Sequence, residues 1–218
     1  LNQGRQEMFY KKFTDSNKSK IFIFGDSHSR DLLLTLIKSS KISEIYEFSL
    51  TDFENADAVL YSRQIYEDEI DKLENLNLIK KAKKEHKKII IVSRAAEFYS
   101  GNISPLIFNL TQNQRNIDAY TNLDKKFIDR NFYKILRDDV IKINIRLKEK
   151  TKKMGALYLD RVKLACDMLK KNCHSMTTDG FALYWDHSHL TWAGVNFFSN
   201  LIDETDWFSP VKKFLIKE

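Results

Sequence analysis

Two short motifs at opposite ends of this chain carry the residue types of a nucleophilic serine. Gly-Asp-Ser ends at Ser27, directly after the apolar run 21–24, and Asp-His-Ser-His runs from Asp186 to His189. A serine hydroxyl is a poor nucleophile at neutral pH, so it needs an imidazole to take its proton and a carboxylate to orient that imidazole. Because Asp186 and His189 are three residues apart, the carboxylate can reach the imidazole that would face Ser27. The predicted chemistry is acyl transfer on Ser27, with His189 as base.

The elements that must position these residues follow from apolar patterning. Lys20 to Phe24 is short, apolar and stopped by glycine, which predicts a buried parallel strand, and helical spacing follows over Ser29 to Ser39. Lys87 to Ser93 contains a continuous apolar block typical of a central strand covered on both faces. We also expect strands at 44–50, 57–61 and Ala156 to Leu159, helices at Ile65 to Glu85, Phe132 to Lys150 and Thr191 to Ile202, and a long loop or short-helix insertion at 94–128.

This alternation of strands and helices predicts a three-layer α/β/α, doubly wound fold with a mainly parallel, flavodoxin-like sheet. Ligands of such folds bind beyond the carboxyl ends of the strands, which is where Ser27 lies. The amide of Ser27, at a helix N-terminus, is then placed to help hold an oxyanion. The alternative is that Ser27 merely caps the helix, which serine does well.

The histidines leave a second chemistry open. Asp186, His187 and His189 are also the beginning of a zinc site, but the sequence offers no further ligand cluster and its cysteines lack the paired spacing of zinc modules. We therefore expect no metal and no organic cofactor. His28 and His187 are expected beside the site rather than as its base, and His86 and His174 on the surface.

Size and charge bound the remaining classes. A chain of 218 residues, 43% of them hydrophobic, suits one domain, which we expect over 20–218, with 1–19 as an N-terminal arm or linker remnant. The net charge of +6 is spread over mixed lysine and glutamate runs without interleaved aromatics, so we expect no nucleic-acid partner, whereas weak attraction to anionic glycans or a membrane surface stays open. No apolar run is long enough to span a bilayer. Because the chain begins with Leu1, we interpret it as an excised domain or processed product.

The only cysteines, Cys166 and Cys173, lie close together in the sequence. A bridge between them would close a short ring and stabilise the fold by roughly 2.5 kcal/mol in the chain-entropy estimate. It would also imply an oxidising compartment. The alternative is two free thiols in a cytoplasmic protein.

With these motifs in view, the chain resembles the SGNH branch of the GDSL esterase and acyltransferase superfamily. Gly-Asp-Ser at Ser27 corresponds to the first block of that family, and the segment from Asp186 to His189 corresponds to its last block. Further matching features are the Gly-Asp-Ser-His at 25–28, the cysteine pair, Asp179-Gly180, Tyr184, the His-Leu-Thr at 189–191 and Ala193-Gly194. Within the family the chain looks like the SGNH domain appended to acyltransferase-three membrane proteins, and the resemblance covers most of 20–205.

The resemblance implies a setting and partners. Members of that group acetylate bacterial cell-surface glycans, with the SGNH domain on the periplasmic or outer side of the inner membrane. It implies an acetyl donor, a glycan acceptor and an upstream or partner membrane acyltransferase domain, and it would explain the cysteine pair as a disulfide. Four aromatic residues are candidates for stacking on sugar rings: Phe98, Tyr99, Trp185 and Trp192.

The middle of the chain departs from the family pattern. The glycine and the Gly-x-Asn that usually complete the oxyanion hole have no clear counterpart, and Arg63 and Arg94 stand at the corresponding strand ends. Either these arginines supply the missing donors, or the site forms fully only with partner or substrate. Each arginine is alternatively a surface or ion-paired residue. Arg30, three residues after Ser27, would face the site from the first helical turn and could bind a glycan carboxylate.

Three functions therefore remain open at this point. The expected one transfers an acetyl group through acetyl-Ser27 to a polysaccharide hydroxyl. With water as the acceptor, the same intermediate makes the protein a carbohydrate O-acetylesterase. The third function is a non-catalytic glycan-binding module of a membrane acetyltransferase.

Overall fold

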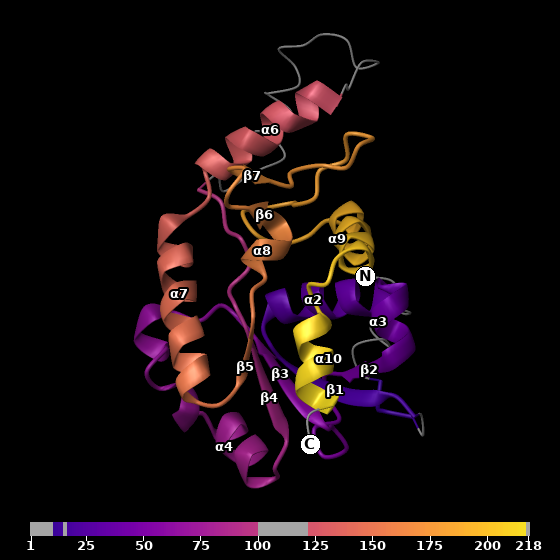
Figure 1. Ribbon diagram of the computed structural model, residues 1–218, viewed down its shortest axis with the longest axis vertical. Helices are drawn as coiled ribbons and strands as arrows, with labels where there is room; N and C mark the ends of the chain where they lie inside the picture. Colours follow the sequence, from indigo (N-terminus) through magenta and orange to yellow (C-terminus); the bar gives the residue numbers. More distant parts are fainter. Residues whose placement is uncertain (1–10, 15–16, 100–121, 217–218) are drawn as a thin grey trace.

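A parallel five-stranded sheet forms the centre of the protein, shown by a computed structural model that describes residues 11–14, 17–99 and 122–216 (Figure 1). The strands are β1 (Ser19–Gly25), β2 (Tyr46–Ser49), β3 (Ala58–Ser62), β4 (Lys88–Val92) and β5 (Leu157–Leu159), in the spatial order β2-β1-β3-β4-β5. All four neighbouring pairs are parallel, so the carboxyl ends of the strands share one edge of the sheet. The predicted α/β/α fold class is confirmed.

Helices cover both faces of the sheet (Figure 1). One face carries α2 (Ser27–Lys38), α3 (Ser40–Ile45), α9 (Trp192–Glu204) and α10 (Ser209–Ile216), and the other carries α4 (Asn77–Lys84) and α7 (Asp138–Lys153). Helix α6 (Asn122–Lys134) lies at one end of the molecule beside the hairpin of β6 (Cys166–Asp167) and β7 (Asn172–Cys173), which follows α8 (Val162–Ala165). No helix within these described ranges is long and apolar enough to cross a bilayer.

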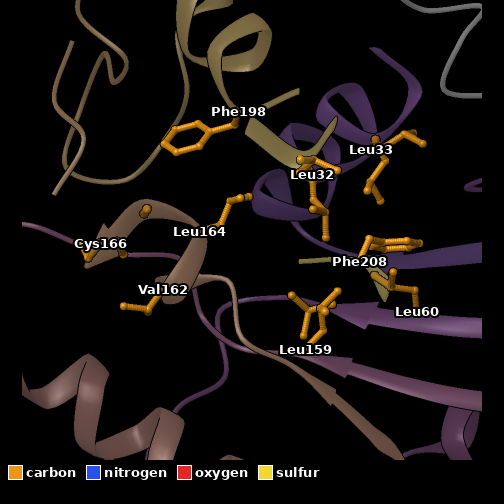
Figure 2. Close-up of a cluster of buried hydrophobic side chains, with 14 of the residues drawn as sticks. Leu32, Leu33, Leu60, Leu159, Val162, Leu164, Cys166, Phe198 and Phe208 are labelled. Atoms are coloured by element: carbon orange, nitrogen blue, oxygen red, sulfur yellow. The ribbon is translucent and has the colours of Figure 1, made fainter. Parts of the chain in front are cut away.

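The two faces of the sheet divide the apolar residues by strict alternation. In β1, Ile21 and Ile23 face the cluster under α2 and α9, whereas Phe22 faces the cluster under α4 and α7. Figure 2 shows the first cluster, in which Leu32 and Leu33 of α2 lie over the sheet residues Leu60 and Leu159. This double coverage explains why the strands are apolar throughout rather than on one face.

The order of strands reverses direction between β1 and β3. The chain passes from β1 outward to β2 and then returns to β3 on the other side of β1. In doubly wound sheets such a switch point opens a crevice at the carboxyl ends of the two strands, where ligands bind. Ser27 stands at the end of β1 and therefore at this crevice.

Cys166 and Cys173 form a disulfide that closes the β6–β7 hairpin. Both cysteines are buried and belong to the core cluster of Figure 2. The alternative of two free thiols is therefore wrong.

Two of the expected helices are wrong in their bounds. Ile65 to Glu85 is not one helix but two short 3-10 turns, Glu67–Glu69 and Leu73–Asn75, followed by α4, because Leu76 is extended at φ −61° and ψ 134°. The apolar residues that suggested the helix, including Ile70 and Leu73, are nevertheless buried. The apolar spacing therefore predicted correctly which residues are buried, but the prediction of one continuous helix was wrong.

The expected helix Phe132 to Lys150 is likewise divided, into α6 and α7. Arg137 is extended and donates its amide to the Glu97 carbonyl at 2.9 Å, which stops the helix between 134 and 138. Helix α6 begins inside the segment 94–128 that we expected as a loop or short-helix insertion, of which 100–121 lies outside the described residues.

Smaller differences lie at the N-terminal edge of the sheet. β1 begins at Ser19, and α3 occupies the start of the expected strand 44–50. The described part of the arm 1–19 lies along β2: Ser49 Oγ donates to the Lys11 carbonyl at 2.7 Å, and Thr14 Oγ1 donates to Glu47 at 2.8 Å.

Candidate active site

Ser27 is presented on a tight turn between β1 and α2. Gly25 makes the turn feasible, because a Cβ at this position would lie 1.6 Å from the carbonyl oxygen of Ser62 at the end of β3. Asp26 is the N-cap of α2 and accepts from the His28 amide at 2.9 Å, while its other oxygen accepts from the Gln64 amide at 2.7 Å. Since Asp26 caps the helix, the alternative capping role for Ser27 is wrong, and the Ser27 side chain is exposed.

Asp186 and His189 lie in a narrow loop between paired residues. Tyr184 and Leu190 form an antiparallel bridge, and the Trp185 amide donates to the His189 carbonyl at 3.1 Å. One carboxylate oxygen of Asp186 accepts the amides of Ser188 and His189, at 2.8 and 2.7 Å. Backbone amides of the loop therefore orient the Asp186 carboxylate independently of the His189 imidazole.

The two motifs meet in one row of hydrogen bonds. Ser27 Oγ lies 2.7 Å from His189 Nε2, and His189 Nδ1 lies 2.7 Å from the second oxygen of Asp186. When Nδ1 carries the proton and donates a hydrogen bond to Asp186, Nε2 is free to accept the proton of Ser27. This arrangement can generate a serine nucleophile.

Two other rings stack on the imidazole of His189. His28 stacks against it with the ring centroids 4.6 Å apart and the planes 7° from parallel, and Trp185 stacks at 5.4 Å and 25°. The in-plane bonds and these two stacking partners together restrict both translation and tilt of the imidazole. His28 and His187 are therefore neighbours of His189, as the sequence predicted, although His174 is partly buried rather than on the surface.

Two titratable groups around His189 have shifted pKa values. Burial, and secondarily the Arg161 guanidinium, lower the pKa of His28 to about 3, so its ring is neutral at physiological pH. Partial burial by itself would raise the pKa of Asp186, but hydrogen bonds from the His189 and Ser188 amides and from the His189 ring outweigh it, so the net pKa is lowered. Asp186 is therefore ionised where it faces His189.

Two charged residues that we did not predict from the sequence form hydrogen bonds to the backbone beside the site. Asp31, one helical turn after Ser27, accepts the Leu190 amide at 3.0 Å. Arg161, a buried residue after β5, donates from Nη1 to the His28 carbonyl at 2.9 Å. The i, i+4 spacing of Ser27 and Asp31 on one helix face was the only sequence signal for the first residue, and nothing local pointed to the second.

The three arginines named from the sequence differ in their surroundings. Arg94 is wrong as a substrate-facing donor: it is 3% exposed, and its Nε and Nη2 donate to Glu97 at 3.0 and 2.6 Å. Arg63 is ion-paired with Glu69 at 3.0 Å but remains about one-third exposed. Arg30 is exposed on the first turn of α2.

In the part of the chain that the structure describes, no three histidine, cysteine, aspartate or glutamate side chains gather in a way that could hold a metal ion. The two nitrogens of His189 instead face Ser27 and Asp186. Of the four aromatic candidates for sugar stacking, Phe98 is buried in the core, whereas Tyr99, Trp185 and Trp192 are exposed.

Solved structures of low sequence identity share the α/β fold of this protein. It is similar to the periplasmic domain of a lipopolysaccharide acetyltransferase from Salmonella ser. Paratyphi A, with a TM-score of 0.62 and 17% identity over 88% of this chain and 84% of that one. It is also similar to a Bacteroides fragilis protein provisionally assigned as an acylhydrolase, with a TM-score of 0.52 and 14% identity over 98% and 94% of the two chains. The sequence itself matches no protein-family model and no curated protein.

Proposed function

We propose that this protein is a serine-dependent O-acetyltransferase that moves an acetyl group to a hydroxyl of a bacterial cell-surface polysaccharide. The observation that carries the proposal is the row Ser27–His189–Asp186, with 2.7 Å at each contact. Ser27 is the nucleophile, His189 the general base and acid, and Asp186 the group that orients His189.

The reaction has two halves that mirror each other. Ser27 Oγ attacks the carbonyl carbon of the acetyl donor while His189 Nε2 takes the serine proton, and the proton then passes to the leaving group as its bond to the carbonyl breaks. In the second half, a sugar hydroxyl attacks the acetyl-serine ester, His189 removes its proton, and Ser27 leaves with that proton restored. Acetate release to water instead of sugar would make the protein an esterase.

Developing negative charge on the carbonyl oxygen needs donors. The amide of Ser27 is in the first turn of α2, where backbone N–H groups have no acceptor within the helix and the helix dipole favours an anion. We propose this amide as one donor. Arg63 and Arg30 are candidates for contacts to the substrate, whereas Arg94 is buried and paired with Glu97.

The fold and the disulfide support a proposal for the cellular setting. A disulfide persists in oxidising compartments, and the Salmonella protein of similar fold is named as the periplasmic domain of a lipopolysaccharide acetyltransferase. We propose an extracytoplasmic location, residues 20–218 as one catalytic domain, and a membrane acyltransferase domain or subunit as the source of acetyl groups.

The decisive experiment is incubation of the chain with p-nitrophenyl acetate, followed by mass spectrometry for acetyl on the peptide that contains Ser27. We expect acetyl-Ser27, and a fall in turnover of at least about 1,000-fold in Ser27→Ala. Ser43→Ala, at a partly exposed serine of α3, is the matched control and should keep wild-type turnover. Wild-type turnover in Ser27→Ala would reject Ser27 as the nucleophile, and absence of both acetyl-Ser27 and turnover in the wild type would favour a non-catalytic glycan-binding module.

The acceptor separates the two catalytic functions. Adding a glycan acceptor should divert acetyl from water to sugar, so free acetate per donor consumed falls while acetylated glycan rises. Unchanged acetate release with no acetylated glycan would instead identify an esterase.

A further inference from the structure

A large groove lies outside the Ser27 site and is lined by residues of the C-terminal half of α6, the start of α7 and the turn of the β6–β7 hairpin. Figure 1 shows α6 beside this hairpin. Its volume is about 700 Å³, which is within the range of sites that hold ligands of several rings. Four cationic side chains line the groove, namely Arg130, Lys134, Lys170 and Lys171, against one carboxylate, Asp138.

Most of this positive charge is uncompensated. Lys170 pairs with Asp167 at 3.2 Å, but among the described residues no carboxylate lies within ion-pairing distance of Arg130, Lys134 or Lys171. Arg137, which is nearby but does not line the groove, is paired with Asp139 at 2.6 Å. Like charges gathered around a concave surface raise the local concentration of anions.

The rest of the lining suits a sugar chain better than a bare ion. Tyr99 and Tyr133 contribute rings that are apolar on their faces and polar at the hydroxyl, and Met168 adds apolar surface. Tyr99 is 67% exposed, so its ring is available to a ligand. A sugar unit that carries a negative charge presents the same mixture of apolar and hydrogen-bonding surface together with an anion.

Two consecutive residues connect the lining of the groove to the loop that holds His189. The Phe98 amide donates to the His187 carbonyl at 3.0 Å, in the loop that holds Asp186 and His189. The next residue, Tyr99, lines the groove and donates its amide to the Ile135 carbonyl at 2.8 Å. One wall of the groove is therefore joined through Phe98 and Tyr99 to the loop that carries His189.

The disulfide fixes one wall of the groove. Met168, Lys170 and Lys171 are in the turn between β6 and β7, and the bridge Cys166–Cys173 closes the hairpin at its base. Closure by a covalent bond reduces the entropy that the turn would lose on binding a ligand.

We propose that this groove binds an anionic stretch of the polysaccharide acceptor, with carboxylate or phosphate groups on its sugar units, while a hydroxyl farther along the same chain reaches Ser27. The inference rests on the proposed acyl transfer, because it assigns the substrate class of that site. The groove acts as a binding subsite and takes no part in the chemistry.

The test compares oligosaccharides of equal length that are neutral, carboxylate-bearing or phosphate-bearing: dextran, oligogalacturonate and phosphorylated oligomannose. Binding to the full chain is measured by calorimetry at low and high salt. We expect at least one anionic oligosaccharide to bind at least 10-fold more tightly than dextran, and this preference to weaken as salt is raised. The comparison of the two anionic probes shows whether carboxylate or phosphate is preferred.

Removing the groove charges should remove the preference. The triple variant Arg130→Gln, Lys134→Gln and Lys171→Gln should bind the preferred oligosaccharide at least 10-fold more weakly. The control variant Lys80→Gln, Lys84→Gln and Lys152→Gln makes the same charge change at exposed positions of α4 and α7 and should stay within about 2-fold of wild type. Equal losses in both variants would overturn the proposal, as would equal affinity for neutral and anionic chains.

Two further measurements separate this proposal from its rivals. Turnover of p-nitrophenyl acetate should be unchanged in the groove variant, and binding of the anionic oligosaccharide should be unchanged in Ser27→Ala. If Ser27→Ala retained full turnover but the groove still preferred anionic chains, the acyl-transfer function would fail while the groove stood. Binding of phosphatidylglycerol vesicles that depends on the groove charges, without binding of any oligosaccharide, would make this a membrane-facing surface and overturn the proposal.

Discussion

The carboxylate of Asp31 accepts a hydrogen bond from the Leu190 amide at 3.0 Å, and this contact joins the helix that begins at Ser27 to the loop that holds His189. Ser27 and Asp31 are one turn apart on α2, and His189 and Leu190 are adjacent. The nucleophile and the base therefore come from segments that are fastened to each other directly beside their point of contact.

We predict that Asp31→Ala lowers kcat for p-nitrophenyl acetate by about 10-fold with little change in KM, because displacement of a group by about 1 Å costs up to 100-fold in rate. Asp31→Asn keeps an oxygen acceptor for the Leu190 amide and should recover most of the activity. A structural role alone would lower the unfolding midpoint of both variants equally. Equal loss of kcat in both variants would therefore contradict a positioning role.

His28 should make the protein less stable in acid. Its folded pKa is about 3 against an ordinary value of 6.5, because burial and the Arg161 guanidinium oppose its charge. Between these values the unfolded chain binds the extra proton and the folded chain does not, so stability is lost as pH falls, by up to about 1.4 kcal/mol per pH unit. Urea unfolding from pH 7 to 4 should show a shallower slope in His28→Leu than in wild type.

The effect of His28 is measured by the difference between wild type and His28→Leu in how the unfolding free energy changes with pH. Asp186 and His174 also have lowered pKa values, and both contribute slopes of the same sign. Parallel stability curves for His28→Leu and wild type would show that His28 does not carry the effect.

Glu97 should be among the most sensitive positions outside the site. It is fully buried, contacts Arg94 at 2.6 Å and Arg137 at 3.2 Å, and lies next to Phe98, whose amide holds the site loop. Glu97→Gln leaves the buried Arg94 without a neutralising charge, which we expect to cost about 3 kcal/mol of unfolding free energy. Chemical denaturation measures this directly.

The matched control is Glu67→Gln. Glu67 pairs with Arg146 at an exposed position, so its loss should change stability little. Similar effects of the two substitutions would contradict the importance of the buried pair.

The disulfide should stabilise the fold by about 2.5 kcal/mol, since it closes a short loop in the unfolded chain. The variant Cys166→Ser with Cys173→Ser should unfold at correspondingly lower urea concentration. Addition of a reductant should shift the wild type toward the variant and leave the variant unchanged. Because Lys170 and Lys171 lie within the loop, reduction should also weaken binding of anionic oligosaccharides.

Local patterns were sufficient for the fold class and for the residues that carry the proposed chemistry. The apolar blocks at 21–24 and 89–92 predicted strands buried on both faces, and the two core clusters contain all of these residues except Phe24, which is exposed. Ser27, Asp186 and His189 could be identified from the sequence because the proposed chemistry depends on residue type and on the short spacing of Asp186 and His189.

The bounds of helices were harder to predict from the sequence where the backbone conformation depends on residues distant in the chain. The apolar spacing of 65–85 is compatible with a helix, but Leu76 is extended there. Arg137 interrupts the helix expected at 132–150 by donating to Glu97, which is 40 residues away in the sequence. Periodicity reports which residues are buried, whereas the continuity of an element also depends on these contacts.

The sequence by itself determined the parallel α/β fold, the serine after the first strand and the Asp-x-x-His pair. Only the tertiary structure decided that Ser27 and His189 touch across 162 residues, that Asp26 rather than Ser27 caps α2, and that the cysteines are joined. It also decided that Arg94 is ion-paired with Glu97 and that Asp31 accepts a hydrogen bond from the loop that carries His189. The reason is that residue type and period are local properties, whereas the partner of a buried charge or a ring is fixed by how the layers pack.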